Sequence, residues 1–176
     1  GRYAEITRFL AGKALYLDTP EARLDQSSTY KALTELSLYI EEYPFSDRKN
    51  EAQNMIFELQ EKLVTKEYLA AKLYYDLGLY MGNNYKSCII TAQNTILNYP
   101  YTKQREELSI LILRSKYRIA ENSFDELKGE RYREAIDEYF AFKNEFPESK
   151  YIKEAEKVYK NSIEEISLEE EEVDIK

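Results

Sequence analysis

The sequence predicts an all-α fold, a right-handed solenoid of about seven antiparallel helices, and three observations support this prediction. First, a small residue is followed three times, twelve positions later, by the proline of an aromatic-proline pair. The copies are Ala32 with Tyr43-Pro44, Cys88 with Tyr99-Pro100, and Ala135 with Phe146-Pro147. Second, a hydroxyl residue stands two positions after each proline: Ser46, Thr102 and Ser149. Third, no stretch sustains a period-two alternation of apolar and polar residues, so we expect no sheet.

Each copy has the properties of the second helix of a hairpin, followed by a stop and a new start. Proline cannot continue a helix, whereas serine and threonine can open one. The small residue lets the second helix approach the first, and larger residues one and two turns later fill the space between stacked hairpins. This combination is typical of tetratricopeptide-like repeats. It predicts second helices near residues 28–43, 85–98 and 130–145.

The N-terminal elements follow from the same signals. We expect a first helix over residues 2–17, a polar loop over 18–26 that contains Pro20, and the second helix over about 28–43.

A long middle helix is predicted by the irregular spacing of the prolines. Pro44 and Pro100 lie 56 positions apart, well beyond the roughly 34 residues of this repeat class. Between Ser46 and Asn83 there is no proline, and apolar residues recur at spacings of three and four. We expect one helix of roughly 35 residues, about 50 Å long, shared by two neighbouring repeats. A break near Thr65 is the alternative.

The C-terminal elements are assigned from turns and charge. After a turn at residues 82–84 we expect helices over 85–98 and 103–127, a turn at Lys128-Gly129, and helices over 130–145 and 151–166. Residues 167–176 are rich in glutamate, which favours a disordered acidic tail beyond a repeat domain of residues 1–166. A partner-binding role for this tail is the alternative.

Composition excludes several function classes. The net charge of -8 argues against sequence-independent nucleic-acid binding, which requires clustered Lys and Arg. No run of about 18 apolar residues is present to span a membrane. The single cysteine, Cys88, occupies a small-residue position, so we expect it to be buried. The 17 tyrosines suit the packing of wide gaps between helices, with ligand stacking as the alternative.

The residues that most catalytic sites need are missing. The chain has no histidine and no glycine-rich phosphate loop. Neighbouring carboxylates such as Glu41-Glu42 diverge by about 100° on a helix, so they are expected to be solvated. We therefore expect no enzymatic activity, no cofactor and no metal. A carboxylate-bound metal enzyme would require acidic side chains that converge in one pocket.

A more distinctive string surrounds the first repeat. Residues 24–33 (LDQSSTYKAL) precede Tyr43-Pro44-Phe45-Ser46, and further strings stand at 69–75 (LAAKLYY), 132–139 (YREAIDEY) and 146–151 (FPESKY). Together they resemble the BamD family over about residues 3–163, its Bacteroidetes members most closely. That family is the lipoprotein subunit of the machinery that inserts β-barrel proteins into the Gram-negative outer membrane.

The resemblance implies a non-enzymatic scaffold on the periplasmic face of the outer membrane, held by a lipid anchor that lies outside this sequence. The implied partners are the barrel-forming subunit and its accessory lipoproteins, with unfolded outer-membrane proteins as a further candidate. The family's docking surface includes an arginine that follows a tyrosine, and Tyr117-Arg118 resembles that pair. A solvated charge at Arg118 is the alternative for the residue. For the protein, the alternative is another tetratricopeptide adaptor, cytosolic or a periplasmic carbohydrate-uptake accessory, that binds a peptide or glycan.

Overall fold

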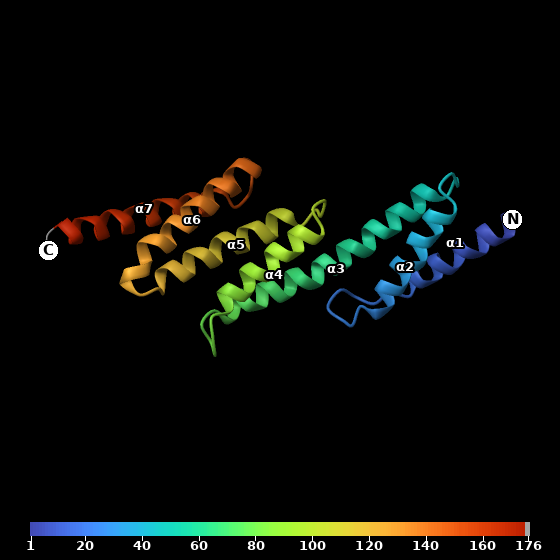
Figure 1. Ribbon diagram of the computed structural model, residues 1–176, viewed down its shortest axis with the longest axis horizontal. Helices are drawn as coiled ribbons and strands as arrows, with labels where there is room; N and C mark the ends of the chain where they lie inside the picture. Colours follow the sequence, from blue (N-terminus) through green and yellow to red (C-terminus); the bar gives the residue numbers. More distant parts are fainter. Residues whose placement is uncertain (175–176) are drawn as a thin grey trace. The chain divides into compact units, whose positions relative to one another are not determined.

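The computed structural model describes residues 1–174, with side chains to residue 171, and that part of the chain contains seven helices and no strand (Figure 1). The helices are α1 (Arg2–Leu17), α2 (Ser27–Glu42), α3 (Lys49–Leu77), α4 (Asn84–Asn98), α5 (Arg105–Glu121), α6 (Asp125–Glu145) and α7 (Ile152–Asp174). The predicted all-α class is confirmed. The bounds of α1 agree with the prediction, and those of α2 and α4 differ from it by one residue at most.

Contacts divide the chain into two compact units, Gly1–Lys66 and Glu67–Lys176. The first unit holds α1, α2 and the start of α3, and the second holds the end of α3 and helices α4 to α7. A single repeat domain over residues 1–166 stays a prediction.

The middle helix is continuous, as predicted, and the alternative break near Thr65 is not observed. α3 has 29 residues, fewer than predicted, because Gly78 ends it. Gly78 has a φ of 55°, and its N–H donates to the Tyr74 carbonyl at 3.1 Å. This left-handed conformation is favoured by glycine and is the usual way to stop a helix.

The core of the first unit lies between α1, α2 and the first half of α3. Its buried apolar members are Phe9, Ala32, Leu36, Tyr39, Ala52, Met55 and Leu59. Gly12 is buried where α1 approaches α2, and a Cβ added there would lie 2.8 Å from Leu36 Cδ2. A side chain at this point would therefore have to displace the buried Leu36 side chain.

The core of the second unit contains a cluster formed by α5, α6 and α7. Its buried members are Ile110, Leu113, Tyr139, Phe142, Ala155 and Val158. The Tyr139 ring stacks on Tyr159 of α7 with centroids 4.7 Å apart. The three small residues that define the repeat, Ala32, Cys88 and Ala135, are fully buried, as predicted.

The link between repeats has the same hydrogen bonds in all three copies. Tyr43, Tyr99 and Phe146 terminate α2, α4 and α6 with nearly identical backbone angles, φ from -127° to -130° and ψ from 61° to 66°. The hydroxyls of Ser46, Thr102 and Ser149 each accept the N–H of the residue two positions later, at 3.0 to 3.1 Å. Each hydroxyl thus caps the turn that leads into the next helix. The helix itself begins a little later, since the N-cap residue of α5 is Gln104 and not Thr102.

The predicted position of the turn between α5 and α6 is wrong. The turn expected at Lys128-Gly129 lies instead between Glu121 and Asp125, where the Asn122 amide donates to the Arg118 carbonyl at 2.7 Å. Gly129 lies inside α6, and a Cβ there would collide with the Glu169 carboxylate of α7. This glycine lies against the Glu169 side chain of the neighbouring helix and does not mark a turn.

The acidic segment that begins at residue 167 is helical as far as Asp174, in contrast to the predicted disordered tail. The remaining two residues of that segment lie outside the described chain. Arg133 of α6 pairs with Glu170 of α7 at 3.6 Å, so part of the acidic run has a basic partner on the neighbouring helix. None of the helices in the described residues is long and apolar enough to cross a membrane.

Candidate partner-binding site

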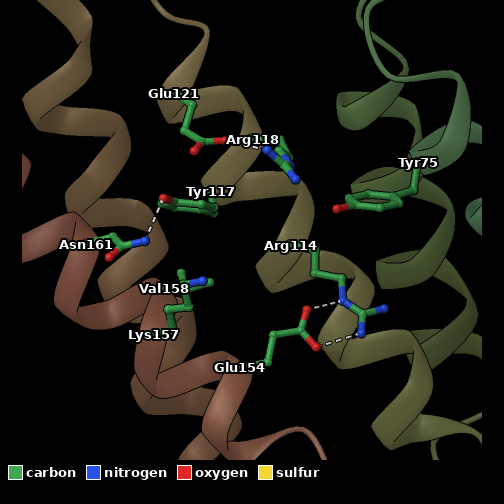
Figure 2. A pocket seen from close by; sticks show the side chains of 9 residues that line it. All are labelled: Tyr75, Arg114, Tyr117, Arg118, Glu121, Glu154, Lys157, Val158 and Asn161. Atoms are coloured by element: carbon green, nitrogen blue, oxygen red, sulfur yellow. Dashed lines mark hydrogen bonds and ion pairs between the residues drawn. The ribbon is translucent and has the colours of Figure 1, made fainter.

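A pocket of about 310 Å³ lies between α5, α7 and the end of α3 (Figure 2). We call it the α5–α7 pocket. Its lining residues are Tyr75 from α3, Arg114, Tyr117, Arg118 and Glu121 from α5, and Glu154, Lys157, Val158 and Asn161 from α7. Both residues of the predicted pair, Tyr117 and Arg118, therefore lie in one pocket. All of these residues belong to the second compact unit.

Arg114 is held by a bidentate ion pair. Its Nε lies 2.5 Å from Glu154 Oε1, and its Nη2 lies 2.8 Å from Glu154 Oε2. The same guanidinium lies 5.2 Å from the centroid of the Tyr151 ring. The hydrogen bonds to Glu154 raise the pKa of Arg114 above its ordinary value. Because both carboxylate oxygens are used, this arginine is a structural link between α5 and α7.

Arg118 is held more loosely and faces solvent. Its Nη1 donates to Glu121 Oε2 at 2.9 Å along the same helix, and 48% of its side chain is exposed. Its pKa is raised, first by a hydrogen bond with the Tyr75 hydroxyl and also by the hydrogen bond and charge of Glu121. An exposed pair of this kind contributes at most about 1 kcal/mol to stability, so Arg118 can exchange Glu121 for another anion at little cost.

Tyr117 forms the inner wall of the pocket. Its hydroxyl accepts the Asn161 amide of α7 at 3.1 Å, and its ring centroid lies 6.2 Å from that of Tyr132. Partial burial raises the pKa of Tyr117, and the nearby charge of Glu121 adds to this effect. The phenol is therefore a fixed neutral group that supports the ring against α6 and α7.

Lys157 supplies a third cation to the pocket. It is exposed on α7, and no described residue forms an ion pair with it. The pocket thus combines Arg114, Arg118 and Lys157 with the two carboxylates of Glu121 and Glu154. A surface with one excess positive charge beside tyrosine rings fits an acidic side chain of a protein partner.

No serine, cysteine or histidine is among the described residues that line the pocket. Cys88 is elsewhere in the unit and is fully buried, and this burial raises the pKa of its thiol. A thiol protected in this way is a poor nucleophile. Among the residues described, no group of three His, Cys, Asp or Glu side chains is placed to hold a metal ion.

Sequence reasoning found two residues of the site and missed the others. Arg114 could have been found, since it stands four positions before Arg118 and shares its helix face. Tyr75, Glu154 and Asn161 reach the pocket from other helices, about 40 positions away in the sequence. No local pattern indicates that they lie near Arg118.

The buried phenol of Tyr132 predicts a loss of stability in alkaline solution. Only 4% of this residue is exposed, and burial, reinforced by the charge of Glu165, raises its pKa to about 12. An ordinary tyrosine has a pKa of about 10. The contribution of the neutral Tyr132 phenol to the free energy of unfolding is complete below pH 10 and is lost as the pH rises through 12. This loss amounts to about 2 to 3 kcal/mol. We therefore expect the difference in free energy of unfolding between Tyr132→Phe and the wild type to shift in favour of Tyr132→Phe when the pH is raised from 8 to 12.

The measurement is chemical denaturation at both pH values, and Tyr101→Phe is the matched control because Tyr101 is exposed. An equal shift in the two variants would contradict a special role for Tyr132.

Comparison with known proteins places the chain in a family. A family model described as outer membrane lipoprotein, YfiO, matches residues 2–122. The match covers α1 to α5, including Tyr117 and Arg118. A search of curated proteins found no match. Because the family model matches well over half of the chain, this protein belongs to the YfiO family of outer membrane lipoproteins.

Proposed function

We propose that this protein is a non-enzymatic scaffold subunit of the machinery that inserts β-barrel proteins into the outer membrane. Its task is to dock the barrel-forming subunit on the periplasmic face of that membrane. The α5–α7 pocket carries this proposal, because the half-exposed guanidinium of Arg118 stands at its surface with an exchangeable partner.

Family membership supports the setting of this function. The YfiO match indicates association with the outer membrane, and the strings at 24–33 and 132–139 resemble BamD, especially its Bacteroidetes members. We propose that the helical hairpins stack as a right-handed tetratricopeptide-like solenoid. Accessory lipoproteins are further proposed partners, and unfolded outer-membrane proteins are proposed substrates.

The docking chemistry follows from the difference between the two arginines. Arg114 uses both oxygens of Glu154, whereas Arg118 engages one oxygen of Glu121, a half-buried carboxylate on its own helix. A partner carboxylate can replace Glu121 and use the planar fork of the guanidinium. Tyr75 and Tyr117 provide rigid rings beside it, and tyrosine and arginine are the residue types that dominate binding energy at interfaces.

Arg118→Glu tests this proposal. We expect co-purification with the barrel-forming subunit to fall at least about tenfold, since a like charge would replace an attractive contact at the interface. The melting temperature is expected to change little, because Arg118 is exposed and its ion pair with Glu121 contributes at most about 1 kcal/mol. The measurement is affinity purification of the full-length lipoprotein from its own envelope, with quantification of the barrel-forming subunit.

Arg133→Glu is the matched control. Arg133 is also an exposed, ion-paired arginine of the second unit, but it does not line the pocket. Equal recovery of the barrel-forming subunit with wild-type protein and with Arg118→Glu would remove Arg118 from the interface.

A further inference from the structure

One long segment of this acidic chain contains no acidic residue. The chain has 33 Asp and Glu residues, yet none lies between Asp76 and Glu106. Residues 77–105 comprise the end of α3, the whole of α4 and the loops on both sides of it. The charged residues within the segment are Lys86, Lys103 and Arg105. The surface formed by α4 therefore differs in charge from the rest of the molecule.

This segment also exposes large apolar side chains. On α4, Ile90 is half exposed and Leu97 is 78% exposed. With Lys86 they occupy about 40° of the helix circumference at 3.6 residues per turn. Beyond the ends of the helix stand Tyr80 and Met81 on one side and Tyr101 on the other, all exposed. We call Tyr80, Met81, Lys86, Ile90, Leu97 and Tyr101 the α4 face.

The other two repeats show that packing does not require apolar residues at the positions of Ile90 and Leu97. The buried small residue gives the alignment, which places Leu97 with Glu41 of α2 and Asn144 of α6. In the same alignment Ile90 corresponds to Thr34 and Asp137. All of these equivalent positions are exposed. At the positions of Ile90 and Leu97 the apolar character belongs to α4 alone among the three second helices, so it points to something that this helix contacts.

The loop before α4 holds its apolar tip in an unfavourable backbone conformation. Met81 has a φ of 54°, a region that costs a residue with a side chain roughly 1 kcal/mol or more, and it is 90% exposed. The tip is framed by hydrogen bonds: Asn84 Nδ2 donates to the Tyr80 carbonyl at 2.7 Å, and Asn84 N–H donates to the Gly78 carbonyl at 2.9 Å. Nothing within the described chain covers the Met81 side chain in return.

We propose that the α4 face rests on a lipid surface that contains anionic phospholipid. Its apolar residues would enter the interface between headgroups and acyl chains, flanked by Tyr80 and Tyr101, a residue type that is enriched at this depth. Lys86, which has no ion-pair partner among the described residues, would lie near the lipid phosphates. The absence of carboxylates removes the repulsion that the rest of this acidic chain would meet at such a surface. The inference relies on the outer membrane association of the family and is independent of docking at Arg118.

A single tryptophan provides the test, because the chain has none. We expect Leu97→Trp to fluoresce as a water-exposed tryptophan in buffer. On vesicles of phosphatidylethanolamine with a minority of phosphatidylglycerol, its emission should shift to the blue and be quenched by brominated acyl chains. The matched control is Asn144→Trp, at the equivalent exposed position of α6, whose emission should not change.

Binding is measured separately by co-sedimentation with the same vesicles. Leu97→Glu is expected to weaken binding at least about tenfold, because it removes an apolar contact and adds a carboxylate. Asn144→Glu, which adds the same charge on α6, should leave binding nearly unchanged.

Three results would overturn the proposal. One is an unchanged emission of the Leu97→Trp variant on vesicles, even if the protein sediments with them, since another surface would then be bound. The second is equal weakening by Leu97→Glu and Asn144→Glu. The third is a wild-type dimer in analytical ultracentrifugation without lipid that Leu97→Glu dissociates, which would assign the α4 face to a second copy of the chain.

Discussion

Ala135→Trp is expected to lower the free energy of unfolding of the second unit by about 3 kcal/mol or more. Ala135 is fully buried on α6, which packs against both α5 and α7. An indole at this position has no space unless one of the neighbouring helices moves away. For a chain of this size, the expected fall in melting temperature is about 6 to 12 °C, measured by circular dichroism.

Ala141→Trp is the control for this variant, since Ala141 lies on the same helix but is exposed. Its melting temperature should stay close to that of the wild type. If Ala135→Trp also melted like the wild type, the register of the repeat, with Ala135 as the close-contact residue, would be contradicted.

The repeat can be predicted because each of its parts acts locally. Proline interrupts a helix by its own ring geometry and missing N–H when it stands beyond the first turn, and the hydroxyls of Ser46, Thr102 and Ser149 bond to backbone groups only two residues away. The predicted ends of α2, α4 and α6 therefore agree with the structure within one residue. The continuity of α3 is predictable for the same reason, since nothing between Ser46 and Gly78 interrupts a helix.

The turn between α5 and α6 could not be assigned from local signals alone. Lys128-Gly129 and Asn122-Ser123 both contain residues that favour turns. In the structure Gly129 lies inside α6 against the Glu169 side chain of α7, a neighbour that no local pattern indicates. Beyond residue 166 the chain stays helical, and the Glu170 carboxylate has a partner in Arg133 of α6, which the acidic composition of the segment does not indicate.

The candidate site was predicted only in part, and the reason is again distance in sequence. The pair Tyr117-Arg118 was found by its resemblance to a family motif. Whether an arginine is a docking group or a structural link depends on its partners, and these come from other helices. Glu154 of α7 engages both nitrogens of the Arg114 fork, whereas the exposed Arg118 has a single-oxygen ion pair with Glu121 on its own helix. Sequence spacing on α5 does not distinguish the two.

Gly12→Leu is expected to have an effect of similar size in the first unit. A Cβ at this position would lie 2.8 Å from Leu36 Cδ2 and 3.7 Å from the Leu36 backbone nitrogen. Leu36 is fully buried in the core between α1, α2 and α3, so it cannot move aside freely. Overpacking should therefore cost about 3 kcal/mol, measured by thermal unfolding. Ala11→Leu, at the exposed neighbouring position of α1, is the control and should unfold like the wild type.

The location of the Gly12→Leu effect tests whether the two units unfold independently. In stacked repeats each hairpin contacts only its neighbours, so stability is approximately a sum of local terms. α3 contributes to both units, and a continuous helix could transmit unfolding from one to the other. We expect hydrogen exchange to accelerate in α1 and α2 of Gly12→Leu while α5 and α6 keep their protection, because the disrupted core is confined to residues before Lys66. Equal acceleration across both units would show instead that α3 couples them into one cooperative structure.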